Sequence, residues 1–200
     1  MRGKSLWMSV VLLLAMAAAA AAPAAAQTPA PTPPAPAVPA PAPPATGGAT
    51  YGVAFQPTVP GVVAQAINGV AYAPDQAPDA VKQAIWAANA IIGRPYRYGG
   101  GHARGFVDRG YDCSGTVSVA LHGADVLDSP LDSGSFMRYG LAGKGQWITV
   151  YTNPGHAFAV IAGLRLDTSA AGDPSRASGP RWRPNLRSTR GYRARHPLGL

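Results

Sequence analysis

The sequence contains no glutamate, so all nine acidic residues are aspartate. A helical zinc peptidase of the His-Glu-x-x-His type needs a glutamate as its general base, and this class is therefore excluded. We expect no metal ion and no organic cofactor. Acidic residues also stop at Asp173, whereas arginine is frequent beyond it, and the formal net charge of the chain is +8.

Long apolar runs are absent beyond the N-terminus, so no later segment is predicted to span a bilayer. Residues 1–26 have the pattern of an export signal, with Arg2 and Lys4 before an apolar run over 6–22 and small residues at 24–26 for cleavage. We expect a secreted or cell-envelope protein. If the signal stays uncleaved, the same run would anchor the chain in the membrane.

Cysteine is nearly absent, because Cys113 is the only one in the chain. A lone cysteine in an exported protein forms no internal disulfide, which leaves an intermolecular partner, a passive core residue or a reactive thiol. The pattern predicts a short helix over 113–122 that ends at Gly123. Asp112 occupies the N-cap position, so the thiol would lie at the positive end of the helix dipole, where the thiolate is favoured.

Composition divides the chain into segments. Residues 27–48 are almost wholly Ala, Pro, Thr and Gly, which predicts a disordered, extended stalk. Apolar residues return over 49–77, but Gly and Pro interrupt every run, so this segment is either a linker or a wrap around the domain. We expect the folded domain over 78–200, beginning with a helix that starts near Pro78 and ends at Gly93.

Three strands are predicted in the second half of that domain. An Asn-Pro-Gly turn separates residues 147–151 from 156–161, and a two-residue Ala162–Gly163 turn leads into 164–168. Because helices precede strands, the fold class is α+β rather than alternating βαβ. We expect N-terminal helices, one carrying Cys113, packed on a small antiparallel sheet.

His156 is the only one of four histidines that begins an apolar strand directly after a turn. With Ala162–Gly163 as the loop, Asp167 falls on the same face as His156 and diagonal to it. A carboxylate there would accept an imidazole N–H and direct the other nitrogen to the thiol. An odd-length loop would instead send Asp167 to the opposite face. The alternative role for Asp167 is a solvated turn residue. Cys113, His156 and Asp167 together fit an activated thiol nucleophile.

Three motifs resemble the NlpC-type cell-wall cysteine peptidases: Pro-Tyr-Arg-Tyr-Gly-Gly at 95–100, Tyr-Asp-Cys-Ser-Gly at 111–115, and Gly-His at 155–156. The resemblance covers roughly residues 80–196. It implies a papain-like α+β core and hydrolysis of peptide bonds in peptidoglycan stem peptides. In that family pattern Cys113 is the nucleophile and His156 the base.

The resemblance also implies how substrate is positioned. Tyr96 matches a tyrosine beside the oxyanion site, and Asp112 and Ser114 flank the nucleophile; the main-chain N–H of Cys113 would supply another oxyanion donor. The chain departs from the pattern in an extra segment, 102–109, between the first two motifs. It also departs at the third catalytic position, which is usually histidine and here aligns with Asp167. We expect His102 and His196 to be structural or exposed.

The arginine-rich C-terminal segment contains Arg176, Arg181, Arg183, Arg187, Arg190, Arg193 and Arg195. One interpretation is attraction to anionic wall polymers or stem-peptide carboxylates, with Arg183, Arg187 and Arg190 as the candidates. The alternative is a solvated surface. Residues 192–196 could also form an edge strand. No recognised nucleic-acid fold or motif is present, so we expect no nucleic-acid partner.

We therefore predict an exported thiol hydrolase that acts on peptidoglycan peptides. Two alternatives stay open at this stage. One is an amidase or acyltransferase that uses the same Cys–His pair on the same fold. The other is a catalytically silent module that binds the wall through its arginines.

Overall fold

The computed structural model describes residues 55–200. The predicted export signal (1–26) and stalk (27–48) lie outside the described residues. Within 55–200, no helix combines the length and the apolar character that a bilayer crossing requires.

Short elements make up the described part of the chain. Its helices are α1 (Asp79–Asn89), α2 (Cys113–Gly123) and α3 (Ser133–Phe136). Its strands are β1 (Thr58–Val59), β2 (Gln65–Ile67), β3 (Val70–Pro74), β4 (Leu141–Ala142), β5 (Ile148–Asn153), β6 (His156–Ile161), β7 (Leu164–Asp167), β8 (Arg181–Arg183) and β9 (Arg193–His196).

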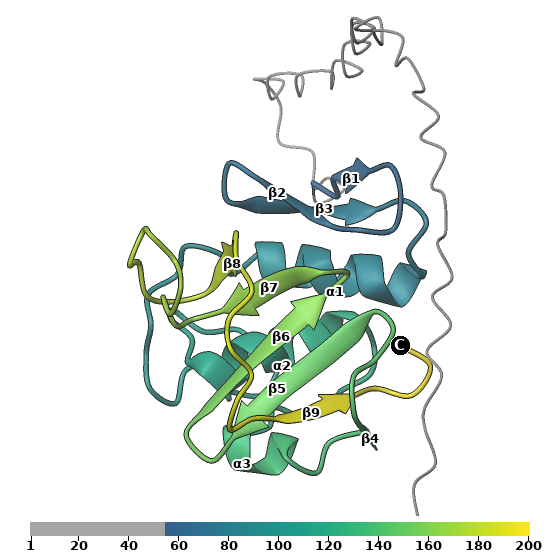
Figure 1. Cartoon of the computed structure of the whole chain (residues 1–200). Coiled ribbons are helices and arrows are strands. Elements are labelled where there is room, and N and C mark those ends of the chain that lie inside the picture. Colours follow the sequence, from purple (N-terminus) through teal and green to yellow (C-terminus); the bar gives the residue numbers. More distant parts are fainter. Residues whose placement is uncertain (1–54) are drawn as a thin grey trace, which may run out of the picture. The chain divides into compact units, whose positions relative to one another are not determined.

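The main sheet has six strands in the order β4-β9-β5-β6-β7-β8, and every neighbouring pair is antiparallel. Helix α2 packs against β6 and β7, and α1 packs against α2 (Figure 1). The predicted α+β class is confirmed, with the helix that carries Cys113 packed on an antiparallel sheet.

Helix α2 is buried on all sides over its first nine residues, from Cys113 to Leu121. A helix without a polar face needs partners all round, and α2 finds them in α1 and the sheet. At its N-terminal end, a Cβ at Gly115 would collide with the carbonyl of Gly100. This glycine therefore allows the loop over 97–101 to lie directly against the first turn of the helix.

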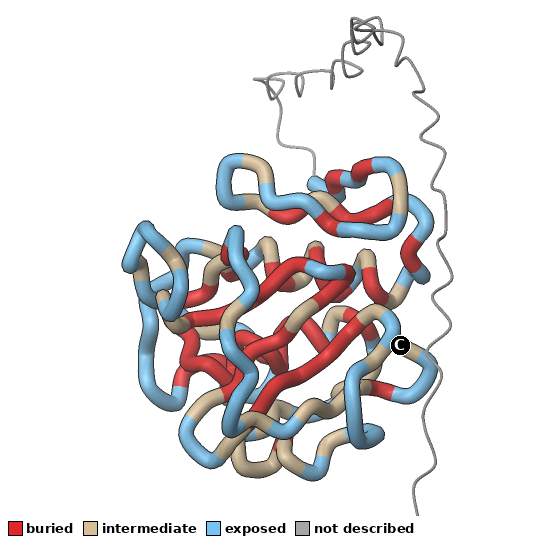
Figure 2. The backbone as a smooth tube through the Cα atoms, in the orientation of Figure 1, coloured by how far each residue is buried: buried red, intermediate tan, exposed pale blue. Residues whose placement is uncertain are grey.

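A tight hairpin joins β6 to β7. Ala162 and Gly163 form its two-residue turn with φ angles of 46° and 83°, and Ile161 pairs with Leu164. Two positive φ angles characterise the type I′ turn that matches strand twist. Strands β6 and β7 are buried along most of their length (Figure 2). In the turn between them, Ala162 is buried and Gly163 is exposed. The register predicted from the sequence is therefore the one observed.

The sequence left residues 49–77 as either a linker or a wrap around the domain. Within this segment, strands β1, β2 and β3 form a small sheet, and β3 packs on α1. The side-chain amide of Asn89 on α1 accepts the N–H of Ala71 at 3.0 Å and donates to its carbonyl at 2.8 Å. Trp86 Nε1 donates to the carbonyl of Pro57 at 3.1 Å. The folded part of the chain therefore begins before residue 78, because this small sheet covers α1.

The strand predicted over 192–196 exists as β9, but the prediction of an edge position was wrong. It lies between β4 and β5, since the two residues of β4 pair along its outer side. Arg195 also binds the segment just before β4, because its Nε donates to the carbonyl of Tyr139 at 2.6 Å.

Candidate active site

Cys113 is the first residue of α2, and its side chain reaches a cleft although the residue is only 7% exposed. Asp112 is the N-cap, and its Oδ1 accepts the N–H of Gly115 at 2.7 Å. The cap satisfies a first-turn donor that would otherwise lack a partner inside the protein. The thiol therefore sits at a fixed, capped helix N-terminus.

His156 and Asp167 meet at the open end of the β6–β7 hairpin. His156 begins β6, Asp167 ends β7, and imidazole Nε2 donates to carboxylate Oδ1 at 2.9 Å. The even-length turn produces this contact, because it leaves both side chains on the same face. With Nε2 engaged, Nδ1 is the nitrogen available to the thiol.

The thiol and the imidazole change each other's acidity. Burial alone would raise the pKa of Cys113, but interactions with the His156 imidazole and the N–H of Ala157 outweigh it and hold the pKa below its ordinary value. Burial also opposes a charge on His156, yet hydrogen bonds with Asp167 and Cys113 raise its pKa to about 9. Both shifts favour a thiolate–imidazolium pair.

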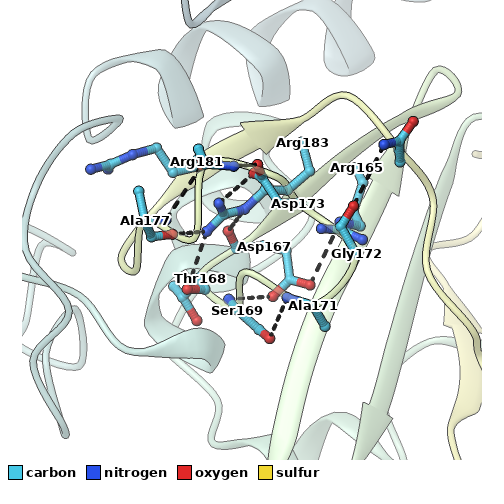
Figure 3. A network of polar contacts seen from close by, with 12 residues as sticks. Arg165, Asp167, Thr168, Ser169, Ala171, Gly172, Asp173, Ala177, Arg181 and Arg183 are labelled. Atoms are coloured by element: carbon cyan, nitrogen blue, oxygen red, sulfur yellow. Dashed lines mark hydrogen bonds and ion pairs between the residues drawn. The ribbon is translucent and has the colours of Figure 1, made fainter.

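Asp167 is almost fully buried and accepts several donors. Its Oδ1 also takes the N–H of Ser169 at 2.8 Å (Figure 3), and its Oδ2 takes Arg187 Nη1 at 3.2 Å. Burial would raise the pKa of Asp167, but these hydrogen bonds and the charge of His156 lower it. The carboxylate is therefore held anionic behind the imidazole.

A cleft of about 370 Å³ opens beside the thiol. Its lining residues are Tyr96, Tyr98, Gly99, His102, Asp112, Cys113, Ser114, Asp132, Ser133, Pro154 and Gly155. They come from the tyrosine–glycine loop, the start of α2, the start of α3 and the turn before β6. The three residues predicted to position substrate, Tyr96, Asp112 and Ser114, all line this cleft.

Tyr96 is held beside Cys113 by hydrogen bonds of the backbone around it. It forms an isolated bridge with Tyr111, and the N–H of Tyr111 donates to the carbonyl of Pro95 at 3.1 Å. Its side chain is half-exposed in the cleft. Burial, followed by the charges of Cys113 and Asp112, raises the pKa of its hydroxyl. The group is thus a neutral hydrogen-bond donor at neutral pH.

His102 also belongs to the cleft, although the sequence placed it outside the site. Its Nε2 donates to Asp112 Oδ1 at 3.0 Å and lies 3.2 Å from Ser114 Oγ, which itself donates to Asp112 Oδ1 at 3.1 Å. The signal that could have found it is the glycine run just before it. Gly101 lies so close to Gly115 that the next residue must fall beside the start of α2.

The arginine predictions need correction. Arg183 is 1% exposed, and its guanidinium donates to Asp173 Oδ2 at 2.6 Å and to the carbonyls of Asp167 and Ala177 (Figure 3). A side chain committed to these buried acceptors cannot contact a wall polymer. Arg187 is also turned inward, toward Asp167, so of the three candidates only Arg190 is exposed.

The arrangement can perform nucleophilic chemistry at a carbonyl carbon. It supplies a thiol of lowered pKa, an adjacent imidazole and a buried carboxylate that orients the imidazole. Over residues 55–200, no group of three or more His, Cys or Asp side chains is arranged to hold a metal ion.

No protein-family model and no curated protein match this sequence. Among solved structures, similarity was found to Rv1477, a hypothetical invasion protein of Mycobacterium tuberculosis, with 24% identity, a TM-score of 0.41 and 58% of this chain covered. The resuscitation-promoting-factor-interacting protein RipA, in a mutated form, gives 23% identity, a TM-score of 0.41 and 59% coverage. The match spans 62% of the length of each of these chains. At this similarity neither protein's activity is transferred to this chain.

Proposed function

We propose that this protein is an exported thiol hydrolase that cleaves peptide bonds in peptidoglycan stem peptides. The observation that carries the proposal is the chain of contacts from Cys113, which lines the cleft, to His156 and from His156 to Asp167. The choice of substrate rests on the resemblance of the three cleft motifs to NlpC-type enzymes. The predicted export signal agrees with a substrate outside the cytoplasm.

The mechanism follows from the protonation states. The Cys113 thiolate attacks the carbonyl carbon of the scissile amide, and the carbonyl oxygen becomes an oxyanion. The main-chain N–H of Cys113 and the Tyr96 hydroxyl are the donors proposed to stabilise it. The His156 imidazolium then gives its proton to the leaving amine, the C–N bond breaks, and a thioester remains on Cys113.

The second half of the reaction reverses the roles of the same groups. Neutral His156 takes a proton from a water molecule, whose oxygen attacks the thioester carbonyl. The C–S bond breaks, the peptide leaves as a carboxylic acid, and the proton on His156 restores the thiolate–imidazolium pair. Asp167 keeps the imidazole in one orientation throughout, because its Oδ1 holds Nε2.

Digestion of purified muropeptides tests the proposal. A peptidase releases a new peptide α-amino group, whereas an amidase frees the lactyl group on the sugar, and mass spectrometry separates the two products. Cys113→Ala and His156→Ala should each abolish turnover without loss of fold. His196→Ala is the matched control, since the His196 ring lies on β9 and donates to the carbonyl of Gly143 rather than to a residue of the site.

The result that would refute the proposal is equally specific. A folded wild-type protein that leaves every muropeptide intact, with a Cys113 thiol no more reactive than free cysteine, would indicate a silent binding module.

A further inference from the structure

Arg187 lies in the connection between β8 and β9, and its guanidinium points into the site rather than to solvent. Nη1 donates to Asp167 Oδ2 at 3.2 Å. The guanidinium carbon also lies 5.3 Å from the ring centre of Phe158 and 5.4 Å from that of Tyr192. A cation over two aromatic faces and against a carboxylate is held in one position.

Arg187 and His156 use different oxygens of the same carboxylate. His156 and the Ser169 N–H take Oδ1, and Arg187 takes Oδ2. The other nearby cation, Arg165, has its Nε 3.7 Å from Oδ2 and makes no side-chain hydrogen bond with any described residue. Arg187 is therefore the arginine side chain that hydrogen-bonds this carboxylate and fixes its rotation.

The same aromatic rings border both the arginine and the imidazole. Phe158 follows His156 by two residues on β6, and the ring centres of His156 and Tyr192 are 6.3 Å apart. Phe158 and Tyr192 meet edge to face at 5.2 Å. Arg187 thus stacks on the rings that limit how far the imidazole can move.

The charged groups around the imidazole also affect its protonation. Other charged or titratable groups around the His156–Asp167 pair are Cys113 and Asp112 at the start of α2, Arg165 on β7, Asp173 in the next loop, Arg183 on β8 and Tyr192 before β9. Among the cations, only Arg187 joins a hydrogen bond to Asp167 with a partly accessible side chain. Its replacement therefore removes a positive charge beside Asp167 without leaving a new buried cation.

We propose that Arg187 is a positioning residue of the thiol–imidazole pair. It holds the Asp167 carboxylate in the orientation that accepts the His156 N–H, and it sets the pH range in which the pair is charged. The inference rests on the proposed thiol chemistry. It assigns a role in the reaction to Arg187, which the arginine-rich composition of the C-terminal segment had suggested as a wall-binding residue.

The test measures alkylation of Cys113 by iodoacetamide as a function of pH in the full chain. Arg187→Met keeps the aliphatic stem on the two rings and removes the charge. Without that cation, forming the thiolate and deprotonating the imidazolium should both require a higher pH, so both midpoints should rise by about half to one pH unit. Arg187→Lys keeps the charge and should shift them much less.

Arg190→Met is the matched control, because it removes the same charge from an exposed position in the same loop. It should leave the alkylation curve unchanged. In an Asp167→Asn background, Arg187→Met should shift the midpoints less than it does alone, since its hold on the carboxylate is already lost and only the direct effect of its charge remains.

Two outcomes separate this inference from the proposed function. If the wild-type thiol titrates like free cysteine, the proposed function fails, and the inference with it. If the wild-type thiol is activated but folded Arg187→Met gives the wild-type curve, Arg187 only packs and the inference alone is overturned. Should the Met variant unfold, Arg187→Gln removes the charge with a polar side chain, and wild-type midpoints in that folded variant would overturn the inference as well.

Discussion

Replacement of Asp112 by asparagine should destabilise the protein while making its thiol more acidic. The carboxylate accepts three donors at Oδ1, from the Gly115 N–H, Ser114 Oγ and His102 Nε2, and a fourth at Oδ2, from the Gly99 N–H at 3.0 Å. Asparagine has one oxygen. If that oxygen keeps the Oδ1 partners, the amide nitrogen of asparagine faces the N–H of Gly99, and two donors then meet without an acceptor.

The expected loss of stability follows from these contacts. Asparagine is as good an N-cap as aspartate, so the helix start survives. The loss is one charge-assisted hydrogen bond and a donor left unpaired at the Gly99 loop, together about 2–3 kcal/mol. For a folded region of this size that corresponds to a melting temperature lower by roughly 5–10 °C.

The thiol should respond in the opposite sense. The charge of Asp112 raises the pKa of Cys113, against the larger lowering by His156 and Ala157. Removing that charge should therefore lower the thiol pKa further. Circular dichroism melts give the stability, and iodoacetamide labelling against pH gives the thiol titration.

Asp132→Asn is the matched control, because Asp132 also caps a helix and lines the cleft but is exposed. It should change stability little. An Asp112→Asn protein with unchanged melting temperature would refute the hydrogen-bond argument. A thiol pKa that rises would refute the electrostatic one.

Four further predictions concern the rest of the site and its support. Asp167→Asn should retain partial muropeptide turnover, whereas His156→Ala should retain none, since orientation is impaired in the first and the base is lost in the second. Activity should fall on the alkaline side near pH 9, where His156, with its pKa raised to about 9, loses its proton; a limb near 6.5 would contradict the ion pair. Asp173→Asn should cost about 3 kcal/mol by leaving buried Arg183 without a carboxylate. Because the Asp173 pKa is lowered from 3.8 to about 2, its stabilisation should be complete above 3.8 and vanish as the pH falls through 2 in acid melts. Binding to purified sacculi should weaken with salt and in Arg190→Gln, but not in His196→Ala, if exposed arginines hold the wall.

The features that the sequence predicted are those with local causes. Asp112 before an apolar segment is a sufficient signal for the start of α2. The Ala162–Gly163 turn sets the register of the next strand, and the register decides that Asp167 faces His156. Each inference needs only a few neighbouring residues, so it could be made without knowing the tertiary structure.

The three-stranded sheet was missed although one local signal was available. Asn68 and Gly69 both have positive φ angles and form the turn between β2 and β3. Asn-Gly is the strongest short hairpin signal, but the flanking runs are short and interrupted by Gly and Pro. The remaining strand, β1, pairs in parallel with β3, and such a non-adjacent pairing has no local signature.

The arginines were misplaced for a different reason. Arginine is almost never fully buried unless it is paired, so composition predicts a surface location. Arg183 is buried because Asp173 and several loop carbonyls surround it, and these partners converge only in the folded chain. Likewise, β9 is internal only because β4, far earlier in the sequence, pairs with it.

The interior position of β9 has a consequence for when activity can begin. Cys113 and its capped helix are complete by residue 123, but Arg187 and Tyr192 lie just before a strand that must insert between β4 and β5. In a chain that is synthesised or translocated from its N-terminus, the thiol appears first and the groups proposed to position its partner appear last. A partly delivered chain would therefore carry Cys113 before the sheet is complete, and the proposed hydrolase would reach full activity only after its synthesis and folding were finished.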